Sequence, residues 1–315
     1  MTGIIYDRTG KGTRLPVLTE WEIIHGLGQP CDRFMVRFPY RKEMLETLKE
    51  ACRFCGMNEG ENVFYGVVDA YTVTCDVRGA VVELEGRSLG ALLMDNEAES
   101  GEYFHLGLED VLDRHVRSEG VEDIQTIDCP PLGHFTVRSG QSQWSVLQEY
   151  LQFSAGVAPR FDRSGTLLLD GGQGGAVRMI GGATPVSSVE FRDDRYGVIT
   201  EVLVKKTRSG ERSTVRNESM IARGGRTRRV LQVPRYLDHD GMRYTGEYQL
   251  ARSREGSAVC ILRLPKLFAG FAGDTLWLND SAVGLTGKFR VSQSRCWAEK
   301  GQFGTELTLA VWEAW

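Results

Sequence analysis

Residues 71–78 read YTVTCDVR, with apolar or aromatic side chains at every second position and mostly polar side chains between them. An alternation with a period of two predicts a β-strand that has one buried face and one face in water. The segments at 62–68 before it and 80–84 after it are rich in β-branched and aromatic residues. We therefore expect an antiparallel meander over residues 62–84.

Both ends of the chain repeat this pattern. Residues 34–38 predict an earlier strand that ends at Pro39. Further short strands are predicted near the C-terminus at 275–278, 289–291 and 307–311, with Gly, Asn and Asp between them. Two β-rich ends indicate two small antiparallel β-barrels or sandwiches.

The middle of the chain has helical spacing instead. Ser142 is placed to cap a helix, and Gly156 stands where a C-terminal cap glycine belongs. The apolar stripe of this helix consists of Trp144, Leu147, Tyr150 and Leu151. Residues 160–169 predict strand, turn and strand, so an α/β module lies between the two β-rich regions.

Composition excludes several classes of protein. The chain has 315 residues, 41% hydrophobic and 25% charged, which describes a globular protein of about two domains and excludes wholesale disorder. A net charge of −4 argues against a binder of polyanions as a whole. No apolar run approaches the roughly 20 residues of a membrane helix, and no secretory signal is visible, so we expect no membrane segment.

Charge is distributed in two opposed blocks. Residues 95–128 hold eleven acidic residues against two arginines, whereas residues 201–235 hold ten basic residues against three acidic ones. Such blocks within one chain steer subunits together. The basic block contains the densest cationic run, which lacks the interleaved aromatics of a nucleic-acid patch, so we expect no specific nucleic-acid partner. The candidate subunit or partner interface is Arg223, Arg226, Arg228 and Arg229.

Short motifs that resemble catalytic or metal sites have simpler explanations. Cys52 and Cys55 fall on the apolar face of a helix predicted over 43–55, and no second cysteine pair or histidine motif completes a zinc site. The sequence DHDG at 238–241 is typical of a turn. The glycine-rich run 170–175 lacks the Lys and Ser/Thr of a phosphate-binding loop, so it predicts an inter-strand loop. We expect no catalytic residue, no metal and no cofactor, and hence no enzyme.

A family resemblance adds what composition and spacing do not supply. Residues 64–69, FYGVVD, followed by 81–98, VVELEGRSLGALLMDNEA, resemble the baseplate hub proteins of phage tails and contractile injection systems. In particular they are similar to the late control D and prophage hub family. The later segments that resemble this family, in the same order, are 140–147, 159–167, 248–252, 273–276, 284–291 and 305–312.

The resemblance implies a β-rich α+β fold in three domains. It places a first tube-like β-barrel at 1–95, an α/β middle module at 96–185 and a second tube-like β-barrel at 186–315, with strand exchange between them left open. Tail tubes have sixfold symmetry and spikes threefold symmetry. A trimer whose subunits each carry two similar β domains presents both symmetries. The two β-rich ends of the sequence suggest such a pair of domains.

The function implied is a non-enzymatic trimeric hub that joins the tail tube to the spike. The implied partners are the tail tube protein, the spike protein, other baseplate proteins and the tape-measure protein. The implied location is a virion or tail-like particle assembled in the bacterial cytoplasm. An alternative is a tail-associated cell-wall glycan-binding module or hydrolase, suggested by the acidic segment 95–128 and the helix of Trp144.

Overall fold

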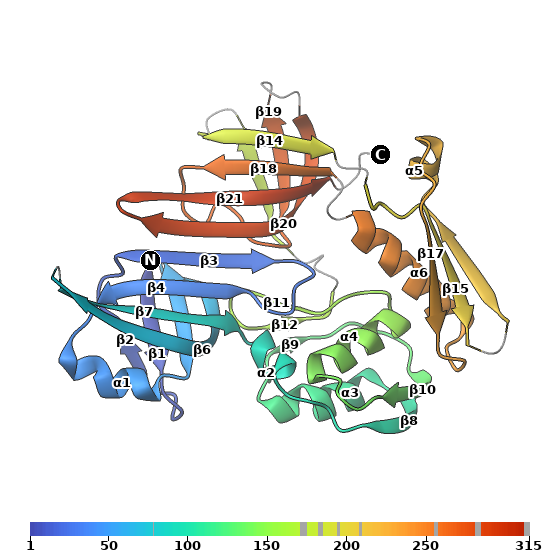
Figure 1. The fold of residues 1–315 in the computed structure, drawn as a ribbon, viewed down its shortest axis with the longest axis horizontal. Coiled ribbons are helices and arrows are strands. Elements are labelled where there is room, and N and C mark those ends of the chain that lie inside the picture. Colours follow the sequence, from blue (N-terminus) through green and yellow to red (C-terminus); the bar gives the residue numbers. More distant parts are fainter. Residues whose placement is uncertain are drawn as a thin grey trace.

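The computed structural model (Figure 1) describes residues 1–77, 79–170, 175–181, 185–193, 196–207, 210–254, 258–280 and 285–311. The other positions, which include Arg78 of the opening stretch, residues 171–174 of the expected loop, Arg208 and Trp312, lie outside the described residues. Strands dominate both ends of the chain, and most helices lie in its middle.

An antiparallel arrangement of strands forms the N-terminal β-rich half. In spatial order it contains β3 (Glu20–Gly26), β4 (Arg33–Pro39), β7 (Gly79–Ser88), β6 (Glu61–Asp76), β5 (Arg53–Asn58), β1 (Thr2–Tyr6) and β2 (Gly12–Arg14). The expected meander is confirmed only in part, because the two strands expected at 62–68 and 71–78 are replaced by one strand, β6, which pairs with β7 as a hairpin. Its core contains Phe34 stacked on Phe54 at 4.1 Å between ring centroids, with Phe64 beside both.

The C-terminal β-rich half has its own hydrophobic core. Its strands are β14 (Ser188–Asp193), β18 (Ala258–Leu264), β21 (Gln302–Val311), β20 (Leu285–Glu299), β19 (Thr275–Asp280) and β13 (Val177–Gly181). All neighbours are antiparallel except β13 and β19, which run parallel. The three strands expected near the C-terminus are confirmed within β19, β20 and β21.

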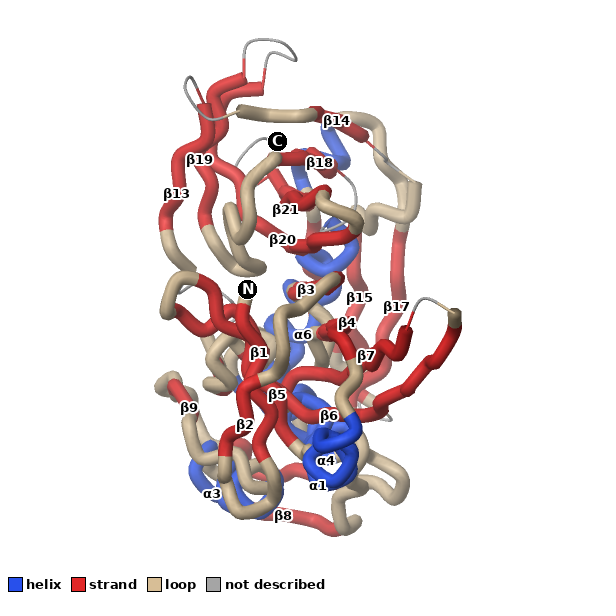
Figure 2. Tube along the Cα trace, turned by 90° about the vertical axis from the view of Figure 1, so that its left-hand side faces the viewer, coloured by secondary structure: helices blue, strands red, loops and turns tan. Residues whose placement is uncertain are grey.

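Strand β20 joins the two halves. Its first part pairs with β19 through residues 285–290, and its second part pairs with β3 through residues 293–298. The change of partner coincides with a register shift between Val291 and Gln293, as a bulge would produce. Figure 2 shows β14, β18, β21, β20, β3 and β4 in this order from top to bottom.

Two closed barrels are not confirmed. Thirteen strands, which come from both halves, form one open, branched sheet, because the 15-residue strand β20 is long enough to belong to both halves. The loop 267–271 between β18 and β19 also packs against the N-terminal core, where Phe268 stacks on Trp21 at 5.4 Å. The β-rich α+β class is confirmed.

The middle module combines helices with short strands. Its elements are α2 (Gly90–Met94), β8 (Gly101–Leu106), α3 (Leu108–His115), η2 (Arg117–Glu119), β9 (Ile124–Gln125), β10 (Leu132–Val137), α4 (Gln143–Ser154), β11 (Arg160–Phe161) and β12 (Leu167–Leu168). The expected helix is confirmed as α4. The Ser142 hydroxyl accepts the N–H of Ser145 at 3.2 Å, and Gly156 ends the helix with φ of +70°.

A three-stranded sheet and a long helix pack against this module. They are β15 (Glu201–Lys206), β16 (Arg212–Arg216), β17 (Arg228–Val233), α5 (Glu218–Ala222) and α6 (His239–Arg254). Buried residues of β15, β17 and α6 share one hydrophobic core with α3, α4 and β10. This core groups residues 199–250 with the middle module, whereas the boundary predicted at residue 186 assigns them to the second β-barrel. That boundary stays a prediction.

Two local predictions were wrong. The helix expected over 43–55 is confined to η1 (Lys42–Met44) and α1 (Leu45–Glu50), since β5 starts at Arg53 and pairs with β1 on one side and β6 on the other. The expected turn at 238–241 is the start of α6. The Asp238 carboxylate accepts the N–H of Gly241 at 2.8 Å, so its turn-forming chemistry begins a helix instead. Within the described part of the chain, no helix combines the length and apolarity needed to cross a bilayer.

Candidate functional site

The basic run predicted as an interface lies at one end of the β15–β17 sheet. Arg228 opens β17 directly opposite Glu201, which opens β15. The guanidinium of Arg228 forms an ion pair with Glu201, and Arg223 forms one with Asp193 at 3.2 Å. Arg226 donates to the backbone oxygen of Gly225 at 2.8 Å. The structure thus places Arg226, Arg228 and Arg229 at the starts of β15 and β17, whereas Arg223 is tied to the last residue of β14.

Glu201 neutralises part of this charge. Its carboxylate accepts from Arg216 at 3.0 Å as well as pairing with Arg228, and these contacts lower its pKa. The side chains of Arg226, Arg228 and Arg229 remain exposed. Arg226 and Arg228 border a shallow hollow that also contains Glu218. The surface therefore stays cationic and accessible, which suits a contact with an acidic partner.

The sequence motifs that resemble reactive sites are tied into the strands. The Cys52 thiol donates to the backbone oxygen of Tyr6 at 3.4 Å, and the Cys55 thiol donates to Asn62 at 3.5 Å. Burial raises the pKa of Cys55, which disfavours the reactive thiolate. All seven cysteines are free thiols. Across the described ranges, no group of three or more His, Cys, Asp or Glu side chains is placed to hold a metal ion.

Four carboxyl groups have shifted pKa values, and none of the four shifts is that of a glycosidase acid. A general acid needs a raised pKa so that it carries a proton near neutral pH. The shifted carboxyl pKa values of Asp7, Asp95, Glu201 and Glu299 are all lowered, chiefly by hydrogen bonds from neighbouring side chains. Nothing in these shifts favours the alternative of a cell-wall hydrolase.

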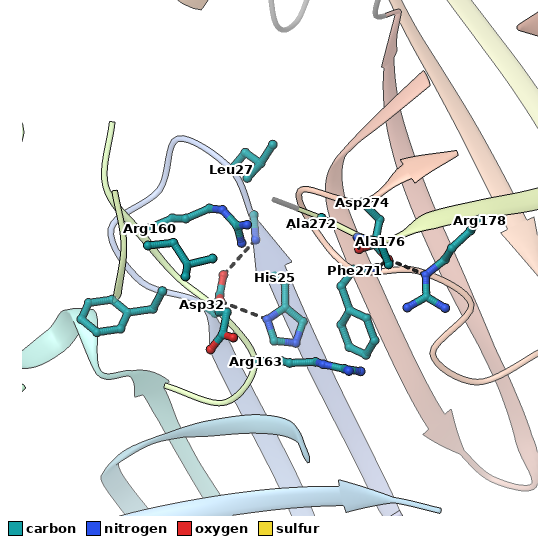
Figure 3. Close-up of a pocket in the computed structure, with 15 residues that line it drawn as sticks. His25, Leu27, Asp32, Arg160, Arg163, Ala176, Arg178, Phe271, Ala272 and Asp274 are labelled. Atoms are coloured by element: carbon teal, nitrogen blue, oxygen red, sulfur yellow. Dashed lines mark hydrogen bonds and ion pairs between the residues drawn. The ribbon is translucent and has the colours of Figure 1, made fainter. Parts of the chain in front are cut away.

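A pocket that the sequence did not reveal lies where the two β-rich halves meet the middle module (Figure 3). Its volume is about 180 Å³. One wall is formed by the connection from β3 to β4, a second by the turn after β11, and a third by β13 and the loop before β19. These segments are far apart in the sequence, and no linear motif links them.

A buried histidine and carboxylate pair lies on the first wall. The Nδ1 atom of His25 is 3.0 Å from the carboxylate of Asp32, and its Nε2 atom donates to the backbone oxygen of Val63 at 3.0 Å. The second oxygen of Asp32 accepts the N–H of Gly26 at 2.9 Å. Both groups are less than a tenth exposed. This network holds the β3–β4 connection against the start of β6.

Phe271 connects the three walls. Its ring meets His25 edge-on at 5.6 Å and lies under the guanidinium of Arg163 at 4.5 Å and that of Arg178 at 5.6 Å. Asp274 fixes the loop that carries Phe271, because it accepts the backbone N–H groups of Phe271 and Ala176, each at 3.0 Å, and pairs with Arg178. The pocket is thus built on a rigid junction.

Two solved structures of tail proteins share this arrangement of elements over nearly the whole chain. The 43 kDa tail protein of prophage MuSo2 from Shewanella oneidensis matches with a TM-score of 0.76 at 15% identity, over 98% of this chain and 98% of that chain. The tail protein from Neisseria meningitidis MC58 matches with a TM-score of 0.76 at 16% identity, over 98% of this chain and 95% of that one. The chain has the fold of phage tail proteins.

The tail-protein fold extends to a secretion machine. The E. coli c3393 protein is a component of the type VI secretion system with structural similarity to the T4 tail proteins gp27 and gp5. It matches with a TM-score of 0.62 at 10% identity, over 94% of this chain and 74% of that chain. No family model and no curated protein matches the sequence. The structural matches confirm the resemblance seen in the motifs.

Proposed function

We propose that this chain is the structural baseplate hub of a phage tail or contractile injection system. In this role it forms a trimer that adapts the sixfold tail tube to the threefold spike. The single observation that carries the proposal is that a tail-protein fold spans 98% of the chain.

The shared strand β20 gives this role a physical basis. Each chain presents two β-rich halves held in fixed relation by the β20–β3 ladder. Three chains around one axis would place six such halves in a ring. The ring of halves would have approximate sixfold symmetry, and the assembly of chains would have threefold symmetry. A closed ring of this kind uses heterologous contacts, in which different surfaces of neighbouring subunits meet.

We propose that charge guides these contacts. The basic end of the β15–β17 sheet, with Arg223, Arg226, Arg228 and Arg229, would meet the acidic segment 95–128 of a neighbour or an acidic partner. In that acidic segment, Arg117 pairs with Glu109 and Asp113, and Arg87 pairs with Asp95. The other eight acidic side chains of the segment form no ion pair with an arginine or lysine among the described residues. The proposed partners are the tail tube, spike, other baseplate and tape-measure proteins, in a particle assembled in the bacterial cytoplasm.

Native mass spectrometry of the purified chain, alone and with tube protein, tests this function. We expect a species of three chains of 35.2 kDa each and a complex with the tube protein. Incubation with purified cell wall is expected to release no soluble glycan. A chain that stays monomeric in both conditions, or that degrades cell wall, contradicts the hub.

A further inference from the structure

We propose that the junction pocket binds a small oxyanion, a phosphate or a carboxylate, through the guanidinium of Arg160. Arg160 opens β11 in the middle module, and its side chain is only 11% exposed. It extends toward the loop before β19, where a Cβ atom on Gly273 would lie 3.1 Å from its Cζ. Gly273 has φ of +93°, so glycine both permits this backbone and leaves room for the guanidinium.

Arg160 has no hydrogen-bond acceptor within the described part of the chain. Its Nε atom is buried without a partner. The carboxylate paired with it, Asp170, stays 3.9 Å away, beyond hydrogen-bond distance. A guanidinium carries five N–H donors, and a buried charged donor left unsatisfied is costly. The side chain is therefore prepared for an acceptor that the described residues do not supply.

The carboxylates that line the pocket are already engaged. Asp32 is held by His25 and the Gly26 N–H. Asp274 is held by Arg178 and two backbone N–H groups. Asp162 accepts the N–H groups of the turn that follows it, at 2.8 and 2.9 Å. Arg160, which has no hydrogen bond to any described residue, thus lies beside carboxylates that already have partners, and an external anion would supply its missing acceptor.

The pocket has room for such a ligand. Its volume of about 180 Å³ holds a phosphate with a few waters, since a water occupies about 30 Å³. Figure 3 shows Arg160 and Asp32 on one side of the pocket, Phe271 and Asp274 on the other, and Arg163 beside Phe271. An Arg fork binds phosphate or carboxylate with two parallel hydrogen bonds. The bound anion would link the middle module to the C-terminal half.

Thermal unfolding of the full chain in sodium phosphate, sodium acetate and sodium chloride at equal ionic strength tests the site. Because a ligand that binds only the folded state stabilises it, phosphate or acetate should raise Tm by at least about 2 °C over chloride. A rise with phosphate alone identifies a phosphate site, and a rise with acetate identifies a carboxylate site. Equal Tm in all three salts overturns the proposal.

Two variants locate the effect. Arg160→Met should lose the anion-dependent rise, whereas the matched control Arg138→Met, at a side chain 61% exposed, should keep it. The readout for each protein is the difference in Tm between the anion and chloride, because Arg160→Met also removes the ion-pair partner of Asp170. An unchanged rise with the anion in Arg160→Met contradicts the site.

A calorimetric titration of the unaltered chain with inorganic phosphate or acetate needs no variant. We expect a saturable heat of one equivalent per chain for the anion that raises Tm. The absence of saturable heat for both anions overturns the proposal. Neither outcome bears on trimer formation, so this test and that of the hub fail or succeed separately.

Discussion

The imidazole of His25 meets the ring of Phe271 edge-on, with 5.6 Å between the ring centroids and 71° between the ring planes. His25 lies in β3, whereas Phe271 lies in the loop before β19. The contact stands beside the β20–β3 ladder that joins the two β-rich halves. The halves are therefore joined by side-chain packing as well as by backbone hydrogen bonds.

Replacing Phe271 by alanine should weaken this joint. Phe271 is 8% exposed and contacts His25, Arg163 and Arg178. We expect the free energy of unfolding to fall by about 3–5 kcal/mol, the usual range for truncating a buried Phe. Urea unfolding followed by circular dichroism measures it. The control Phe303→Ala, at a side chain 52% exposed, should change little, and equal losses in both variants would contradict the joint.

Trp144 should anchor the middle module. Its side chain is 5% exposed and stacks on Phe161 of β11 at 6.2 Å between ring centroids, as the stripe on this helix predicts. Trp144→Ala should cost about 3–5 kcal/mol of unfolding free energy. The matched control is Trp277→Ala, since Trp277 is 48% exposed on β19. A Trp144 variant with unchanged melting and weaker partner binding would make Trp144 a contact residue instead.

His115 should make stability fall in mild acid. Its Nδ1 donates to Gln143 at 2.7 Å, while its buried Nε2 has no partner among the described residues. Burial lowers its pKa below 6.5. As pH falls below about 6.5, the unfolded chain therefore gains a proton before the folded chain does, and the stability present at higher pH is lost.

Unfolding free energies measured at about pH 7.5 and about pH 5.5 check this. His115→Gln keeps a donor toward Gln143 but does not titrate, so its stability should fall less than that of the parent over this interval. An equal fall in both proteins would show that other groups carry the acid dependence.

Charge reversal should separate assembly from folding. In Arg226→Glu with Arg229→Glu, trimer or tube assembly should weaken, whereas the monomer's unfolding free energy should stay within about 0.5 kcal/mol because both side chains are exposed. We leave Arg228 unchanged because it pairs with Glu201. Analytical ultracentrifugation at two salt concentrations measures assembly.

Assembly of the parent should also weaken with salt. The Debye length falls from about 10 Å at 0.1 M to about 3 Å at 1 M, so exposed charges attract less. The control is Lys49→Glu, which changes a residue of α1, on the opposite side of the molecule from β17 (Figure 1). This variant should assemble as the parent does. If the variant with both Arg226→Glu and Arg229→Glu assembles normally at both salt concentrations, these arginines are exposed to solvent and form no part of the interface.

Local patterns predicted the local elements. The alternation at 71–77 predicted part of β6, and the stripe from Trp144 with its Ser142 cap predicted α4. Both signals act within a few residues, so a single sequence contains them. The prediction of a helix over 43–55 was wrong because a long-range contact decides this segment. Strand β5 pairs with β1, which lies some 50 residues earlier in the chain.

Long-range relationships were beyond these patterns. The β20–β3 ladder pairs Cys296 with Ile23, and no periodicity shows that one strand will serve both halves. The pocket brings Arg160 against Gly273, which no spacing rule connects. The sequence identified the positive charges of the basic run. That Glu201 neutralises Arg228 follows only from the register of β15 with β17, which places the two residues opposite each other.

The most direct test of the hub is an image of the assembled particle tip in which this chain carries a label. Cryo-electron microscopy of such particles should show three labels per particle, at one level between the last ring of the tail tube and the spike. Six labels in that ring, labels along the tube or labels away from the tip would contradict a trimeric hub.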